Sequence, residues 1–207
     1  MRTWRHATIA AAVGAAMVAG FGFAAPPAEA SYIVTLTQQG SNVVANGSGS
    51  IDLTELFITS VGSARSGVFP DTGLIITGPV SFKEIVIYAG LTGPVSFGSG
   101  GTPIATSSGS GDPVGIGGSA NQLFLPVGYA SGSALSDNST YDNATFASLG
   151  VMPGTYVWTL GGQQDDSFTL DIETPAVPEP GSLALLGTGL AAFGLVGFAF
   201  RRRRASV

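Results

Sequence analysis

Glycine is the feature that most limits what this chain can fold into. Of the 31 glycines in 207 residues, 23 lie between Ser31 and Val177, where they separate short apolar segments. Glycine in a helix interior costs about 1 kcal/mol relative to alanine, so long helices are disfavoured there. Short strands joined by glycine-containing turns suit this composition. Residues 31–174 are therefore predicted to form an all-β domain.

Alternation of side chains supports the prediction of strands. In residues 32–37, Tyr32, Val34 and Leu36 would share one face. Residues 156–160 and 167–172 also alternate, and the six residues between them predict a hairpin loop. Further strands are expected at residues 43–46, 50–54, 74–77, 81–89 and 122–127. Several short strands of this kind predict an antiparallel sandwich or a jelly roll.

Three other local features carry predictions. A short helix is expected at residues 144–149, with Asn143 as N-cap and Gly150 as C-cap. The segment 77–82 (TGPVSF) recurs at 92–97, which predicts two similar turn-and-strand units beside each other. Residues 98–119 are so rich in Gly and Ser that a long surface loop is expected there.

The N-terminus has the three parts of a secretory signal. Arg2 and Arg5 precede an apolar run at residues 7–25, and Pro26-Pro27 leads to the small-residue site Ala28-Glu29-Ala30. The prolines end the helix and leave Ala28 and Ala30 extended for the signal peptidase, so cleavage is expected after Ala30. The alternative is a retained transmembrane helix, because 19 residues nearly span a bilayer.

The C-terminus combines an uncharged stretch with a basic end. Residues 182–200 would form a helix about 28 Å long, close to the hydrocarbon thickness of a bilayer. Four arginines follow at once, Arg201, Arg202, Arg203 and Arg204, and such a cluster resists translocation. The sequence therefore predicts a transmembrane helix with a cytoplasmic end, and a domain on the other side of the membrane.

Two prolines hold the backbone extended just before this stretch. Pro178, Glu179 and Pro180 form a Pro-Glu-Pro motif, in which each proline fixes φ and disfavours helix in the preceding residue. An extended backbone suits binding by a protease, and a stiff spacer at the membrane surface is the alternative.

Residues 177–204 resemble the C-terminal sorting signal of PEP-CTERM proteins. Pro178-Glu179-Pro180, the segment 181–187 (GSLALLG), the apolar span and the arginines stand in the order that this signal requires. The resemblance implies processing by an exosortase, a membrane-embedded cysteine transpeptidase of Gram-negative bacteria. Pro178, Glu179 and Pro180 would then be recognition residues of a substrate. The segment 153–170 also resembles one that precedes the sorting signal in many such proteins of unknown activity.

Composition limits the chemistry available to the expected domain. The chain has no cysteine, and its one histidine, His6, lies in the predicted leader, so Ser-His-Asp, Cys-His and typical zinc sites are excluded. Eleven carboxylates against Arg65 and Lys83 give residues 31–177 a net charge of −9, which disfavours nucleic acid as a partner. No cofactor and no catalytic residue is expected.

Three minor alternatives remain open for the domain. A glycoside hydrolase would need two acids from the set Asp52, Glu55, Asp71, Glu84, Asp112, Asp137, Asp142, Asp165, Asp166, Asp171 and Glu173. Calcium needs only oxygen ligands, which residues 137–143 and Asp165-Asp166 offer at close spacing. A carbohydrate-binding module would stack sugars on Tyr129, Tyr141, Tyr156 or Trp158, unless Tyr156 and Trp158 belong to the core.

These observations together predict a non-enzymatic protein that is exported across the inner membrane. It would be anchored transiently by its C-terminal helix and then processed by exosortase. Its destination would be the cell surface or the extracellular matrix, and family resemblance implies an association with exopolysaccharide or biofilm.

Overall fold

The computed structural model describes residues 30–174, and this part of the chain is all-β with one short helix. The expected leader (residues 1–29 of it) and the expected tail (residues 175–207), with the Pro-Glu-Pro motif, the apolar span and the arginines, lie outside the described residues. Within residues 30–174, no helix is both long enough and apolar enough to cross a bilayer.

The strands form two seven-stranded sheets. Sheet A has the order β7 (Leu91–Thr92), β13 (Gly154–Leu160), β14 (Gln163–Ile172), β1 (Ser31–Gln39), β2 (Asn42–Gly49), β12 (Leu135–Tyr141) and β9 (Ser108–Gly111). Sheet B has the order β3 (Phe57–Ala64), β6 (Lys83–Ala89), β11 (Gln122–Pro126), β10 (Val114–Gly117), β5 (Leu74–Thr77), β4 (Gly67–Phe69) and β8 (Ile104–Ala105). Two 3₁₀ turns, η1 (Pro70–Thr72) and η2 (Gly118–Ala120), and the helix α1 (Phe146–Leu149) complete the fold.

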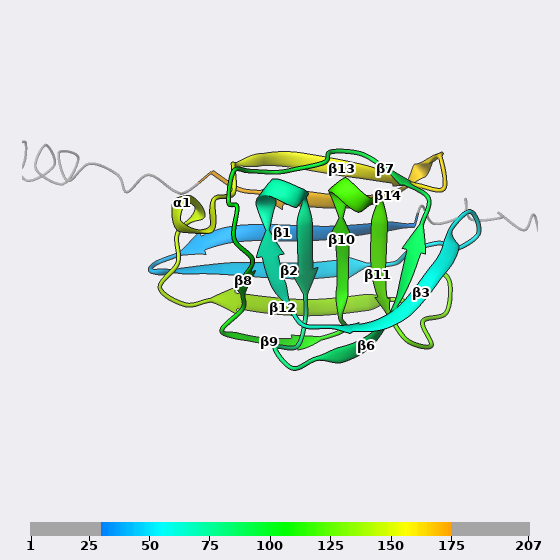
Figure 1. Ribbon diagram of the computed structural model, residues 1–207, viewed down its shortest axis with the longest axis horizontal. Helices are drawn as coiled ribbons and strands as arrows, with labels where there is room; N and C mark the ends of the chain where they lie inside the picture. The colour runs from blue at the N-terminus through cyan, green and yellow to red at the C-terminus, as the bar shows by residue number, and fades with distance from the viewer. Residues whose placement is uncertain (1–29, 175–207) are drawn as a thin grey trace, which may run out of the picture.

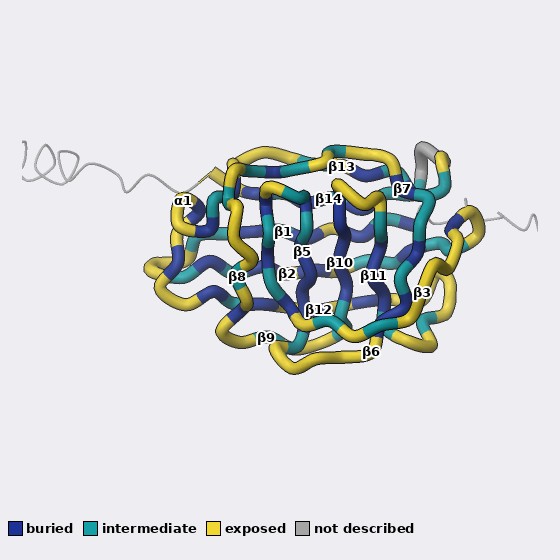
Figure 2. Tube along the Cα trace, in the orientation of Figure 1, coloured by how far each residue is buried: buried dark blue, intermediate teal, exposed yellow. Residues whose placement is uncertain are grey.

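The two sheets face each other across one core, and their strands run in crossing directions (Figure 1). Alternate residues of β1, β2 and β12 are buried, and the buried positions of the two sheets form a continuous layer in Figure 2. Tyr32, Trp158 and Phe168 lie fully buried in sheet A, and the Phe168 ring packs against both of the other rings, with centroids 5.5 Å from Tyr32 and 6.1 Å from Trp158. The Trp158 indole N–H donates to the Pro94 carbonyl at 2.8 Å, so this N–H group has a hydrogen-bond partner although the side chain is buried.

One pair of strands contradicts the prediction of a purely antiparallel fold. β1 pairs with β14 in parallel, from Ser31 opposite Ser167 to Leu36 opposite Ile172, whereas the other strand pairs are antiparallel. Parallel neighbours cannot be joined by a hairpin, and here almost the whole domain separates them in sequence. β1 and β14 therefore bring the two ends of the described chain into one sheet.

Most of the expected strands are confirmed, but the structure of residues 50–54 and of residues 98–119 differs from the prediction. Residues 50–54 form no strand, because Asp52 accepts hydrogen bonds from the Thr54 N–H (2.9 Å) and hydroxyl (2.6 Å), which holds a turn. Residues 98–119 are not a long loop, since they contain β8, β9 and the central strand β10.

The hairpin and the helix are confirmed with altered ends. The β13–β14 turn is only two residues long, Gly161 and Gly162, with positive φ at both as a type I′ turn requires. Thr145, not Asn143, caps α1: its hydroxyl accepts from the Ser148 N–H at 3.1 Å, and the Ser148 hydroxyl accepts from the Thr145 N–H at 2.8 Å. Gly150 ends the helix in the left-handed conformation, as expected.

The repeated TGPVSF segment does not form two equivalent units. Phe82 of the first copy precedes β6 and is 66% exposed, whereas Phe97 of the second copy follows β7 and is 1% exposed in the core. Position in the fold, and not the local sequence, decides what each copy does.

Candidate functional site

The acids that sequence analysis singled out are mostly scattered over the described surface. Asp52, Asp71, Glu55, Glu84, Asp142 and Glu173 lie in exposed or partly exposed positions on different elements. Within residues 30–174, no group of three or more acidic, histidine or cysteine side chains is placed to hold a metal ion. The fold does bring two acids together, Asp112 just after β9 and Asp137 in β12, and their charges interact.

Asp137 is buried inside the fold, although its sequence suggested only that residues 137–143 could offer oxygen ligands to calcium. β12 spans this segment, so Asp137 and Asn138 point to opposite faces and do not gather oxygen ligands on one side. Asp137 is 6% exposed and accepts a short hydrogen bond from the Tyr32 hydroxyl of β1. A signal was present: Leu135, Asp137 and Tyr141 share one parity, and the two apolar residues mark that parity as the inward one.

Gly47 of β2 makes the room for this pair. A Cβ atom at Gly47 would collide with the Tyr32 hydroxyl and would lie 2.7 Å from Asp137 Oδ1. The Tyr32 hydroxyl can therefore reach across β2 to the Asp137 carboxylate only because the residue beneath them has no side chain. The Asp112 side chain is held in place by the backbone of β12, because its Oδ2 accepts a hydrogen bond from the Ser136 N–H at 3.0 Å.

The environment of this pair favours a proton on the carboxyl group. Burial raises the pKa of Asp137 to about 6, the negative charge of Asp112 adds to the rise, and the hydrogen bond from Tyr32 opposes it. Burial also raises the pKa of the Tyr32 hydroxyl far above its usual range, so Tyr32 is the donor. Asp137 Oδ1 has no hydrogen-bond partner among the described residues, which leaves part of the cost of burial uncompensated.

Of this pair, Asp137 is buried and Asp112 is partly buried. Neither Asp112 nor Asp137 lines either of the two surface hollows described below. A glycosidase needs both carboxyl groups to reach the bond that is cleaved, so the pair fits a structural, pH-sensitive role better than hydrolysis.

The four aromatic residues proposed for sugar stacking have structural partners. Trp158 and Tyr141 are buried in the core, which for Trp158 is the alternative that the sequence analysis gave to sugar stacking. The partly buried Tyr156 donates to the Met152 carbonyl at 3.1 Å and packs edge-on against Phe97. The Tyr129 hydroxyl accepts from the Ile51 N–H at 2.9 Å and lies 2.9 Å from the Ser133 carbonyl, which joins two loops. Their ring faces are therefore committed to the fold.

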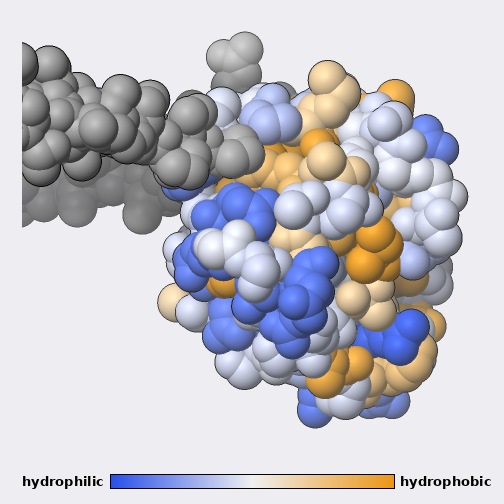
Figure 3. Space-filling view, turned by 90° about the vertical axis from the view of Figure 1, so that its left-hand side faces the viewer, coloured by the Kyte–Doolittle hydropathy of each residue, from blue (hydrophilic) through white to orange (hydrophobic). Residues whose placement is uncertain are grey.

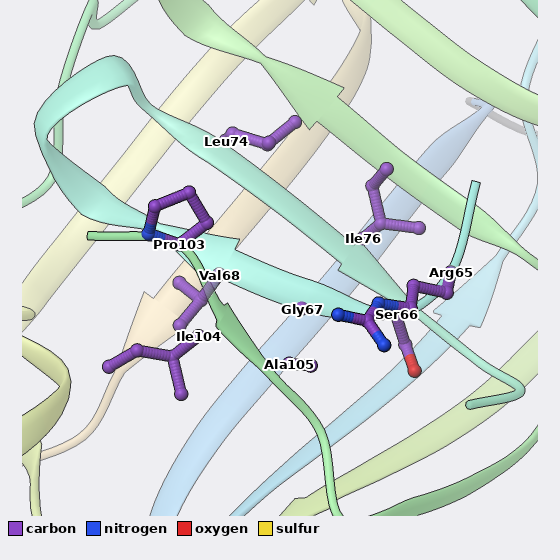
Figure 4. Close-up of a pocket in the computed structure, with 9 residues that line it drawn as sticks. All are labelled: Arg65, Ser66, Gly67, Val68, Leu74, Ile76, Pro103, Ile104 and Ala105. Atoms are coloured by element: carbon purple, nitrogen blue, oxygen red, sulfur yellow. The ribbon is translucent and has the colours of Figure 1, made fainter.

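The outer face of sheet B carries the first of the two hollows. Val68, Leu74, Ile76 and Ile104 line an apolar pocket of about 130 Å³ between β4, β5 and β8, with Arg65 at its rim (Figure 4). An engineered cavity of about 150 Å³ holds benzene, so this pocket can take one small apolar group. The Ser66 and Thr106 hydroxyls beside it bond to each other, and the Ser66 hydroxyl also donates to the Pro79 carbonyl at 3.1 Å.

A second hollow of about 510 Å³ lies near the start of β1. Serine and glycine residues make up most of its wall, namely Ser31, Ser48, Gly49, Ser50 and Gly132, with Ala134 and Leu135. Its lining contains no aromatic ring on which a sugar could stack.

Apolar side chains also cover much of the outer face of sheet B. Ile76, Ile85 and Phe124 form a small buried cluster there, with Leu74 and Ile87 packed against it. Antiparallel sheets commonly present a polar outer face to water, and this one does not. Figure 3 views the end that carries α1 and shows apolar patches towards the side on which sheet B lies.

The comparisons with known proteins identify no relative. No family model matches the chain, and neither a curated protein nor a solved structure does.

Proposed function

We propose that this chain is an exported surface or extracellular-matrix protein that an exosortase processes, with a non-enzymatic β domain. The observation that carries the proposal is the order of three features in residues 177–204: Pro178-Glu179-Pro180, an uncharged stretch of 19 residues, and four arginines. Each part has a physical role, since the extended motif binds a protease, the stretch stops in the bilayer and the arginines stay inside.

The described domain supports this proposal by its construction. We assign it to the β-sandwich class, because both sheets cover one core with crossing strands. β1 begins at Ser31, directly after the expected cleavage site, and β14 ends at Ile172, shortly before the sorting motif. The domain would therefore occupy the length of chain between the two processing signals.

A binding role fits the described side chains better than catalysis. Asp137 is buried and Asp112 is partly buried, whereas the apolar side chains of Phe57, Ile58 and Val61 stay exposed at the edge of sheet B. Exposed apolar surface of this kind marks contact sites in soluble proteins. The domain would associate with the exopolysaccharide or biofilm matrix. The contact surface would not include the rings of Tyr129, Tyr141, Tyr156 and Trp158, which have structural partners.

Intact mass of the mature protein tests the processing. In wild-type host cells the chain is expected to end near Pro178, and in cells that lack the transpeptidase it is expected to end at Val207. A chain that still ends at Val207 in both strains would contradict the proposal. A Glu179→Ala variant in wild-type cells separates recognition of the motif from general proteolysis, because only recognition predicts that this variant keeps its tail.

A further inference from the structure

β3 is an edge strand, and its register against β6 shifts between Ile58 and Ser60, which indicates a β-bulge. It pairs with β6 on one side only, and residues 57–64 contain no charged residue and no proline. Residues 57–61 are all exposed, and β3 is exposed over most of its length in Figure 2. Natural proteins usually block such an edge with charges or proline, because its free N–H and C=O groups can pair with another chain.

Two apolar side chains of β3 lie on the core-facing side of sheet B but beyond the area that sheet A covers. Ile58 lies opposite Tyr88 and Val61 lies opposite Val86, so both share the inward face of sheet B with these buried residues. They are nevertheless 65% and 66% exposed, because no strand of sheet A covers them. Phe57, at 69% exposure, adds an apolar ring at the start of the strand.

Charges of opposite sign stand at the two ends of this strand. Glu55 precedes β3, and Arg65 follows it directly. Lys83 lies opposite Ala64, so the two cations of residues 31–174 are at the same end of β3. Glu84, opposite Ser63, is the acid beside them. Arg65 also lies over the exposed Phe82 ring, 5.6 Å from its centroid, which holds its charge near the strand end.

We propose that β3 binds β3 of a second copy of this chain, with the two strands antiparallel about a two-fold axis. This arrangement brings the Glu55 end of each strand towards the Arg65 end of the other and places Ile58 and Val61 beside the strand of the second copy. A two-fold interface must be self-complementary, and a strand with an apolar middle and opposite charges at its ends meets that requirement. The two B sheets would then form one continuous sheet. The inference stands independently of the proposed processing of the tail.

Cysteine cross-linking of the full-length chain tests the pairing directly, because the chain contains no cysteine of its own. Ser60 lies midway between Glu55 and Arg65, so Ser60→Cys would face its own copy across the axis. Directly opposed residues in antiparallel strands have Cα atoms about 4.5–5.5 Å apart, which suits a disulfide. The protein would be purified in mild detergent and oxidised, with Thr59→Cys and Val61→Cys to cover the neighbouring registers.

The expected result is a disulfide-linked dimer for at least one of these three variants. The matched control is Val157→Cys, which places the thiol on an exposed strand residue of sheet A and is expected to stay monomeric. Equal cross-linking of the control, or none in all three β3 variants, would overturn the proposal. Cross-linking of β3 to a different protein in cells would overturn it as well and would identify a foreign strand as the occupant.

Charge exchange supplies a second, independent measurement. Glu55→Arg or Arg65→Glu alone would place like charges together and is expected to lower the dimer yield of the cysteine variant about tenfold. The double variant restores opposite charges and is expected to recover the yield. If both single variants dimerise as well as the parent, or if the double variant recovers nothing, the charged ends do not pair as proposed.

Discussion

Replacement of Asp137 by Asn gives the sharpest test of the buried pair. The raised pKa of the Asp137 carboxyl group means that the folded state binds a proton more tightly than the unfolded chain does. In the unfolded chain the pKa of this group is near 3.8. The stabilising contribution is therefore complete below pH 3.8 and is lost as pH rises through about 6. The shift of about 2 pKa units corresponds to about 3 kcal/mol in the free energy of unfolding.

Urea unfolding at several pH values between 4 and 7.5 measures this contribution. The difference in unfolding free energy between Asp137→Asn and the parent is expected to change by about 2.4 kcal/mol over this range, with the variant relatively more stable at pH 7.5. Taking the difference at each pH cancels the contributions of the other acids. Asp142→Asn, an exposed acid just after the same strand, is the matched control.

Parallel pH profiles for the parent and Asp137→Asn would refute this reasoning, because they would show that Asp137 titrates alike in the folded and unfolded chains. Tyr32→Phe separates the hydrogen bond from the burial. It is expected to destabilise the domain by about 1–3 kcal/mol at pH 7.5, where Asp137 is ionised and loses its donor.

Three further predictions concern the fold and its surface. Gly47→Ala is expected to cost about 1–3 kcal/mol in thermal or urea unfolding. Gly62→Ala should cost well under about 1 kcal/mol, because a Cβ atom at Gly62 would meet no atom within 4 Å. Similar costs for the two variants would contradict the close approach at Gly47. Thr145→Ala removes the cap of α1 and is expected to cost about 1 kcal/mol, and an unchanged midpoint in urea would argue against the capping box. Tyr129→Phe is expected to lower the melting temperature and to leave any glycan-array signal of the full chain unchanged; loss of sugar binding without loss of stability would favour the carbohydrate-binding alternative.

The sequence predicts what is local in this fold. Residues 32–37 alternate because a sheet buries one face, and Tyr32, Val34 and Leu36 are indeed fully buried. The short helix and the β13–β14 hairpin follow from caps and turn residues. The β1–β14 pairing has no such signal, because it depends on how the complete sheet closes.

The prediction of a long surface loop over residues 98–119 is wrong at β10, because the glycines there make room for packed side chains. Gly115 faces the outer side of sheet B, where a Cβ atom would lie 2.7 Å from Ile76 Cγ1. The aromatic ring of Phe124 similarly lies over Gly117. Glycine here provides space for neighbouring side chains within a sheet, although its composition alone indicates a loop.

The candidate site was missed for a related reason. Asp137 is a charged residue in a polar run, and polar runs usually lie in loops. The structure buries it because Leu135 and Tyr141 of the same strand need an apolar layer, and Tyr32 on β1 and Gly47 on β2 supply a donor and the space for it. An acid can be buried at this position only because β1, β2 and β12 lie side by side there.

The parallel pairing of β1 with β14 sets the order in which this protein can mature. A ribosome delivers β1 first and β14 last, and a translocation pore would keep the same order, yet the two are adjacent in the middle of sheet A. β1 can pair early with β2, but its other edge must stay without β14 until residue 172 has emerged. Chaperones that shield exposed strands would have their longest task on this first segment, and truncation anywhere before β14 would leave the sheet split in two.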